Sequence, residues 1–94
     1  MGRRKYPPLK VSEAESILIA LGFAEKHCVG SHSQWERPAQ DDRERAIVTV
    51  DQSIDEFDER LIKSMIRQSR CSREEFYGAT KRTAKKIGVA VGAR

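Results

Sequence analysis

Apolar residues near the start of the chain recur at intervals of three and four, which places them on one face of a helix. Ser12 and Glu15 before this stripe have the spacing of a capping box, and Gly22 after it suits a left-handed helix end. These signals predict a helix that starts at Ser12 and ends before Gly22. Its apolar face consists of Ala14, Ile17, Leu18 and Leu21.

The middle of the chain has the pattern of three short strands separated by turn-forming residues. Gly30 and Ser31 form a tight connection between the first two strands, and the polar segment 39–44 forms a hairpin loop before the third. The third strand is rich in β-branched residues, which favour extended structure. The predicted strands cover residues 23–29, 32–37 and 46–50.

Helical spacing returns in the last third of the chain. Ser53 and Glu56 form a possible capping box, so a second helix is expected to begin near Ser53 or Asp55. A break near residues 70–71 precedes another capping box, and a last helix is expected to run from there to Gly88. The broad apolar face of the second helix contains Phe57, Leu61, Ile62, Met65 and Ile66, and the last capping box is Ser72 with Glu75.

This order of elements predicts an α+β fold in one domain, because 94 residues support a single modest core. Helices bury their apolar stripes most economically on one face of a small antiparallel sheet. The expected architecture is therefore helix, three-stranded antiparallel sheet, helix, as in a double-stranded-RNA-binding domain (dsRBD), with an additional C-terminal helix. The other sheet face, or its edge near residues 30–32, is left free for a ligand.

The charge of the chain favours a polyanionic partner. Formal net charge is +4, and residues 60–94 contain ten Lys and Arg residues but only two acidic ones. A solvated basic surface explains the same composition. Residues 1–10 combine basic residues with Pro7 and Pro8, which predicts a flexible, extended lead-in.

The cysteines and the hydropathy of the chain limit the cofactors and the cellular location that we expect. Cys28 and Cys71 lie far apart and form no metal-type cluster with the two histidines, so free thiols, no metal and no cofactor are expected. No apolar run approaches membrane-spanning length and no signal peptide is present, so we expect a cytoplasmic protein that does not contact membranes.

Gly30, Ser31 and His32 are the main candidates for chemistry. A histidine titrates near neutral pH, so it can take a proton from a ribose hydroxyl and return one to a leaving oxygen. The N–H groups of Gly30 and Ser31 are candidate phosphate contacts, and so are the side chains of Lys10, Lys26, Lys63 and Arg67. His27 is the only other imidazole, and it is more simply an exposed strand residue.

Three blocks of the chain resemble the HicA-type toxins, small mRNA interferases of toxin–antitoxin pairs with a dsRBD-like fold. The blocks are Leu21-Gly22-Phe23 followed by Gly30-Ser31-His32, then Val48-Thr49-Val50, then residues 61–76. The resemblance implies a dsRBD-fold domain over residues 11–78, followed by a basic extension over residues 79–94.

For function, the resemblance implies the toxin of a type II pair, a ribosome-independent and metal-independent endoribonuclease that cleaves mRNA. His32 matches the family's essential histidine and would act as general acid or base. The implied partners are RNA and a cognate HicB-like antitoxin protein. No small-molecule cofactor is implied.

The chain departs from the family after Val50, where Asp51-Gln52-Ser53 replaces the usual proline and the histidine that follows it. This loss and the basic last helix favour a second hypothesis, a non-catalytic RNA-binding module of the same fold. A third hypothesis is a protein-interaction domain that docks through the acidic segment 51–59. Trp35 could stack on a base, although a core position is the simpler expectation in so small a domain.

Overall fold

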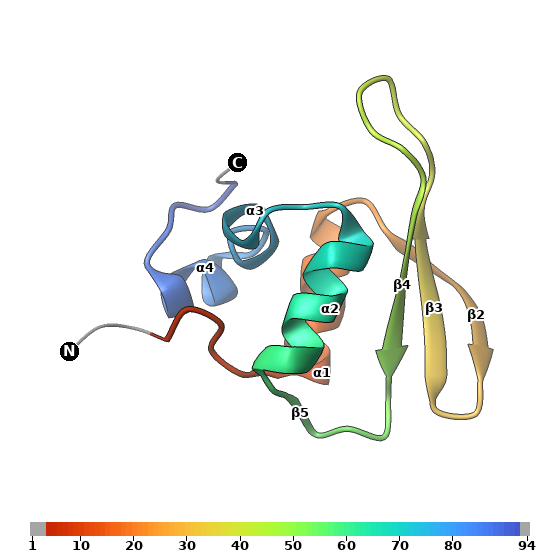
Figure 1. Ribbon diagram of the computed structural model, residues 1–94, viewed down its shortest axis with the longest axis horizontal. Helices are drawn as coiled ribbons and strands as arrows, with labels where there is room; N and C mark the ends of the chain where they lie inside the picture. The colour runs from red at the N-terminus through yellow and green to blue at the C-terminus, as the bar shows by residue number, and fades with distance from the viewer. Residues whose placement is uncertain (1–3, 93–94) are drawn as a thin grey trace.

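The computed structural model describes residues 4–92 of the chain (Figure 1). Nine elements follow one another, and the two termini of the described chain lie away from the three-stranded sheet (Figure 1). The elements are β1 (Leu9–Lys10), α1 (Val11–Ala20), β2 (Ala24–Val29), β3 (His32–Arg37), β4 (Ala46–Asp51), β5 (Glu56–Phe57), α2 (Glu59–Ser69), α3 (Arg73–Tyr77) and α4 (Lys81–Ile87).

Strands β2, β3 and β4 form an antiparallel sheet in that order. A two-residue turn joins β2 to β3, with Val29 opposite His32. Gly30 at the first turn position has φ +58°, a backbone conformation that favours glycine and that type II′ hairpin turns require there. The sheet therefore ends at a tight corner beside His32.

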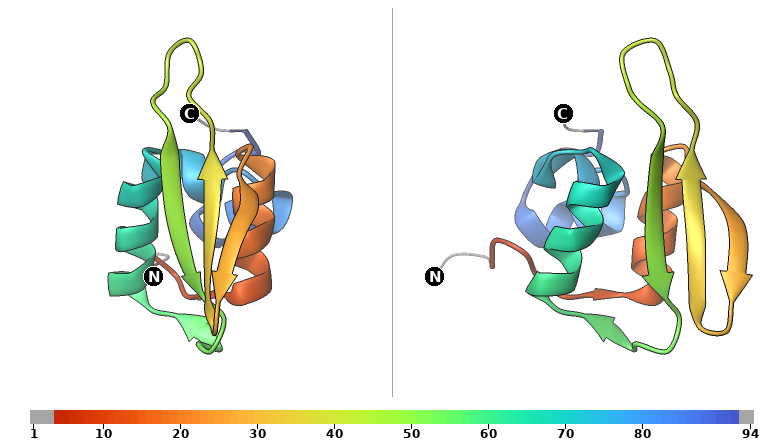
Figure 2. Two further views of the ribbon diagram at one scale, coloured as in Figure 1. Left: turned by 90° about the vertical axis from the view of Figure 1, so that its right-hand side faces the viewer. Right: turned by 45° about the vertical axis from the view of Figure 1, so that its right-hand side comes forward.

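Helices α1 and α2 both cover the same face of this sheet (Figure 2). Along β3 and β4 the side chains alternate, so that Trp35, Val48 and Val50 are buried beneath the helices while Gln34 and Ile47 are exposed. The left view of Figure 2 shows the strands in front of the helices with their outer face uncovered. The predicted α+β, dsRBD-like arrangement is confirmed.

A second, two-stranded sheet corrects the predicted start of the second helix. Residues 56–57 form β5, which pairs with β1 so that Phe57 lies opposite Leu9, and α2 begins only at Glu59. Ser53 does not cap a helix, because its hydroxyl and its N–H both donate to the Asp51 carboxylate in a local turn. Asp58 is the cap instead, and its carboxylate accepts the Leu61 N–H at 3.0 Å.

The first and last helices also differ from prediction at their ends. Helix α1 begins at Val11 rather than Ser12, since Glu13 accepts the backbone N–H of Lys10, while Glu15 accepts a hydrogen bond from Gln52. The predicted last helix is divided in two. The Ser72–Glu75 capping box opens α3 as expected, but α4 has its own cap at Thr80, whose hydroxyl accepts the Thr83 N–H.

Both ends of the described chain pack onto the central helices. In the segment assigned to the lead-in, Leu9 is fully buried and the Pro7 carbonyl accepts the Tyr77 hydroxyl at 2.7 Å. In the extension, Ala84 and Ile87 of α4 are buried. No helix within residues 4–92 is long and apolar enough to cross a membrane.

Candidate functional site

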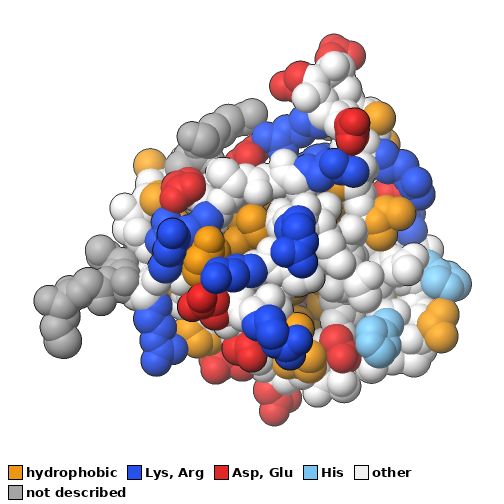
Figure 3. Space-filling model, in the orientation of Figure 1, with side chains coloured by type: hydrophobic (Ala, Val, Ile, Leu, Met, Phe, Trp, Pro, Cys, Tyr) orange, Lys and Arg blue, Asp and Glu red, His pale blue; other side chains and the backbone are white. Residues whose placement is uncertain are grey.

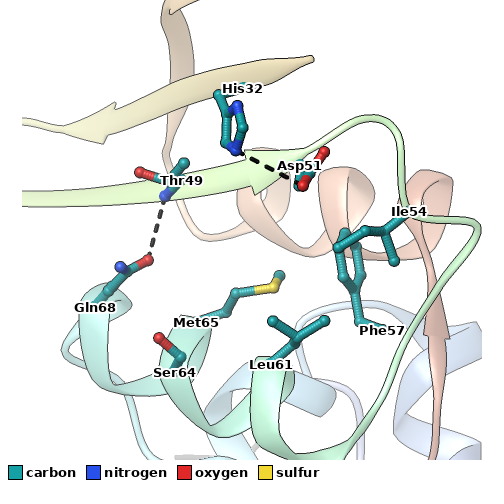
Figure 4. A pocket seen from close by; sticks show the side chains of 9 residues that line it. All are labelled: His32, Thr49, Asp51, Ile54, Phe57, Leu61, Ser64, Met65 and Gln68. Atoms are coloured by element: carbon teal, nitrogen blue, oxygen red, sulfur yellow. Dashed lines mark hydrogen bonds and ion pairs between the residues drawn. The ribbon is translucent and has the colours of Figure 1, made fainter.

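His32 stands at the corner of the sheet, immediately after the Gly30-Ser31 turn. Its side chain is 63% exposed, so the imidazole is open to a ligand. The register of β3 and β4 places it directly opposite Asp51, and Nε2 of His32 lies 3.7 Å from Oδ2 of Asp51 (Figure 4). An imidazole and a carboxylate therefore share one edge of the outer sheet face.

Local hydrogen bonds hold Asp51 in place and in its charged form. The Ser53 hydroxyl donates to Oδ1 at 2.6 Å and the Ser53 N–H donates to the same oxygen at 3.0 Å. These bonds, with smaller contributions from Ser31 and His32, hold the pKa of the Asp51 carboxyl below its usual value. Asp51 is therefore a carboxylate at neutral pH, able to stabilise a positive imidazolium beside it.

A buried polar network supports this corner from below. The Ser33 hydroxyl donates to the Val50 carbonyl and accepts hydrogen bonds from the Trp35 indole N–H at 3.1 Å and from the Gln52 amide at 3.0 Å. Ser33 is fully buried and Trp35 is 6% exposed, so Trp35 is a core residue with its polar atom satisfied. The base-stacking alternative for Trp35 is wrong.

A hollow of about 210 Å³ opens beside the His32–Asp51 pair, between β4 and α2 (Figure 4). Its walls are partly apolar, and Gln68 lies at one end, where its side-chain oxygen accepts the Thr49 N–H at 3.2 Å. The residues that line it are His32, Thr49, Asp51, Ile54, Phe57, Leu61, Ser64, Met65 and Gln68.

The four candidate cations do not line this hollow. Lys63 forms an ion pair with Glu59 and lies over the Tyr6 ring, while Arg67 lines a neighbouring hollow beside β4. Lys26 lies at the bulge of β2, and Lys10 is the residue before α1. Lys and Arg side chains are spread over the face that carries α2 and β4, with both histidines toward one edge of it (Figure 3).

The structure adds two residues to the site, Asp51 and Gln68. In the sequence, Asp51 is a departure from the family pattern and the start of the acidic segment 51–59. The long loop between β3 and β4 hides that it faces His32. Gln68 lies on α2, and nothing local predicts that its amide reaches the edge of β4. Both contacts depend on register and packing between distant segments.

The remaining candidates are separate from this hollow. His27 lies opposite Gln34, two pairs further along the β2–β3 ladder than His32, and is exposed. Both cysteines are free thiols, and the Cys71 sulfur accepts a hydrogen bond from Arg43 at 3.4 Å. Within the described part of the chain, no three His, Cys, Asp or Glu side chains gather closely enough to hold a metal ion.

Comparison with known protein families shows which family the chain belongs to. The family model described as HicA toxin of bacterial toxin–antitoxin matches residues 11–70, well over half of the 94 residues. The chain belongs to the HicA toxin family. The matched segment of this HicA toxin runs from α1 to the end of α2, so it contains the hairpin with His32, the edge strand β4 and the wall of the hollow.

Membership of the HicA family makes this chain the toxin component of a toxin–antitoxin pair, with an antitoxin as its partner. Helices α3 and α4 lie beyond the matched segment, although they contribute Phe76, Tyr77 and Ile87 to the same core. No curated protein and no solved structure matches this HicA toxin significantly.

Proposed function

We propose that this HicA toxin is an endoribonuclease that cleaves mRNA, with His32 transferring the proton and without a metal ion. The observation that supports this most directly is the exposed His32 imidazole, 3.7 Å from the Asp51 carboxylate at the mouth of a hollow. A histidine kept accessible beside a fixed carboxylate is suited to general acid–base catalysis.

The proposed reaction uses the RNA itself as nucleophile. His32 removes the proton from a ribose 2′-hydroxyl, the 2′-oxygen attacks the adjacent phosphorus, and the bond to the 5′-oxygen breaks. The proton held on the imidazolium then passes to the departing 5′-oxygen, leaving a 2′,3′-cyclic phosphate and a 5′-hydroxyl. Asp51 stabilises the imidazolium between these two steps, because opposite charges at this separation favour the charged form.

Cleavage of labelled single-stranded RNA in the presence of EDTA tests this proposal. His32→Ala should lower the rate by roughly 10²–10⁴-fold, the usual contribution of a positioned acid or base. His27→Ala is the matched control, since it removes the other exposed imidazole of the same sheet, and it should cleave like the wild type.

Two results would contradict the assignment. Equal cleavage by the wild type and His32→Ala would remove His32 from the mechanism. Salt-dependent RNA binding by the wild type with no cleavage would instead favour the non-catalytic RNA-binding module.

The proposal extends to the antitoxin. A HicB-like antitoxin in the cytoplasm would silence the toxin by covering His32 and the basic face beside it (Figure 3). Adding the antitoxin should then abolish RNA cleavage in vitro. It should also protect His32 from chemical modification, and a complex that left the imidazole reactive would exclude this mode of inhibition.

A further inference from the structure

A second hollow continues the first along the seam between β4 and α2. It has a volume of about 490 Å³, and Gln68 lines both hollows, so they meet at this residue. The six residues of β4, which form one side of the seam, span about 17 Å at the usual rise per residue. The residues that line the second hollow are Arg45, Ala46, Ile47, Arg67, Gln68 and Arg70.

The two ends of this seam differ in chemistry. One end holds the His32–Asp51 pair, and the other holds three arginines: Arg45 just before β4, and Arg67 and Arg70 at the end of α2. Guanidinium groups bind phosphate oxygens with several donors at once. We propose that one strand of RNA lies along this seam, with its backbone phosphates on Arg45, Arg67 and Arg70 when the reacting ribose is at His32. This assignment rests on the proposed nuclease function.

The edge of β4 favours a single strand over a duplex. Strand β4 pairs only with β3, and its Thr49 N–H points away from β3, toward Gln68. Because strand residues alternate in direction, the backbone groups of Ile47 point into the seam as well. The Ile47 side chain is 38% exposed at the same place. The Thr49 N–H is already bonded to Gln68, so the seam offers the backbone groups of Ile47 and an apolar contact to one chain of nucleotides.

Two of the three arginines have carboxylate partners, but both pairs leave donors free. Glu36 contacts Nε of Arg45, and Glu44 contacts Nη1 of Arg70 at 3.1 Å. Ion pairs this exposed are weak in water, so a phosphate can compete for the remaining guanidinium donors. Arg67 has no ion pair among the described residues. The acidic groups beside the seam are therefore Glu36, Glu44 and Asp51, each already engaged with its own partner.

Arg70 is held at the seam despite an unfavourable backbone. Its φ is +61°, the left-handed region, and it is the only described non-glycine residue with positive φ. Its Nε donates to the Arg45 carbonyl at 3.2 Å, so the side chain lies against the end of β4. A strained residue that supplies a cation to a hollow is consistent with a binding role.

The salt dependence of RNA affinity tests this path. In a non-cleaving His32→Ala background, the affinity for a short fluorescent single-stranded RNA is measured at several salt concentrations. Arg45→Gln/Arg67→Gln should reduce the slope of log affinity against log salt by about 1.4, because each lost single-strand phosphate contact contributes about 0.7. Lys81→Gln/Lys85→Gln on α4 removes the same charge away from the seam and should leave the slope unchanged.

Three results would overturn the path: equal slopes for both double variants, no detectable RNA binding by His32→Ala, or equal competition by a duplex of the same length. The path and the nuclease proposal fail separately. His32-dependent cleavage by the wild type together with equal slopes would exclude only the path. A reduced slope for Arg45→Gln/Arg67→Gln together with no RNA cleavage by the wild type would exclude only the nuclease function.

Discussion

At the scale of single residues, the proposed chemistry of this toxin depends on which residue faces His32 across the sheet. That residue is Asp51, fixed by two hydrogen bonds from Ser53 and held in its charged form. The pair has the geometry of a proton carrier with a stabilising anion. A protein with an uncharged residue at this position would have a histidine but no anion to stabilise the imidazolium.

Asp51→Asn tests this role. The amide keeps the shape of the side chain and can still accept the Ser53 hydrogen bonds, but it cannot stabilise the imidazolium. We expect kcat for RNA cleavage to fall about tenfold, equal to about 1.4 kcal/mol, with KM little changed. Asp55→Asn, at an exposed position outside the hollow, is the control. Wild-type kcat in Asp51→Asn would show that the carboxylate takes no part.

Arg70 gives a prediction in which stability and binding change in opposite directions. Arg70→Gly removes the left-handed strain at the end of α2, so the free energy of unfolding should rise by about 1 kcal/mol. The lost ion pair with Glu44 is exposed and contributes little.

The measurement is urea unfolding alongside RNA affinity, which should fall. Arg67→Gly, inside the helix, is the control and should lower stability by about 1 kcal/mol. A less stable Arg70→Gly would mean that the side-chain contacts of Arg70 outweigh its strain.

At the scale of elements, the position of α2 determines whether the hollow exists. This helix supplies Leu61, Ser64, Met65 and Gln68 to its wall. Its first turn is held by Asp58, whose carboxylate accepts the Leu61 N–H. The cap therefore affects both the stability of the helix and the wall of the site.

Asp58→Ala should lower the free energy of unfolding by about 0.5–2 kcal/mol, the usual cost of losing a helix cap. The measurement is chemical denaturation, with Asp55→Ala as the control, because Asp55 is equally exposed but precedes β5 rather than the helix. An equal effect of the two substitutions would argue against a specific capping contribution.

The elements also show how far local patterns reach. The strand over residues 32–37 agrees with β3 at both ends, because its turn residues and Pro38 mark its limits locally. The helix predicted from residue 53 or 55 is wrong, since Phe57 fits the apolar spacing of α2 but pairs with Leu9 in a strand. For the same reason, the sequence did not predict that Asp51 and Gln68 belong to the site. Pairing between distant segments has no local signal.

At the scale of the whole molecule, Tyr77 joins the α3 region to the start of the chain. Burial raises the pKa of its hydroxyl, which donates to the Pro7 carbonyl. Above about pH 10 an unfolded tyrosine loses its proton, while Tyr77 in the folded protein keeps it. The unfolded state then binds fewer protons, so stability must fall as the pH rises through this range.

We expect the free energy of unfolding to decline more steeply above pH 10 in the wild type than in Tyr77→Phe. The variant should lose about 0.5–1.5 kcal/mol at neutral pH, because it lacks the hydrogen bond. Tyr6→Phe, at a half-buried position on the same side, serves as the control. Parallel pH profiles for the wild type and Tyr77→Phe would exclude this linkage.

The contact between Tyr77 and Pro7 affects how the toxin folds while it is being synthesised. Its two partners are 70 residues apart, a stretch that ribosomes translate in roughly 4–14 s at 5–20 residues per second. Until Tyr77 leaves the ribosome, the segment around Pro7 lacks its hydrogen-bond partner. Strand β1 likewise cannot pair until β5 has been synthesised. The fold is therefore completed only late in synthesis, after residue 77 has left the ribosome.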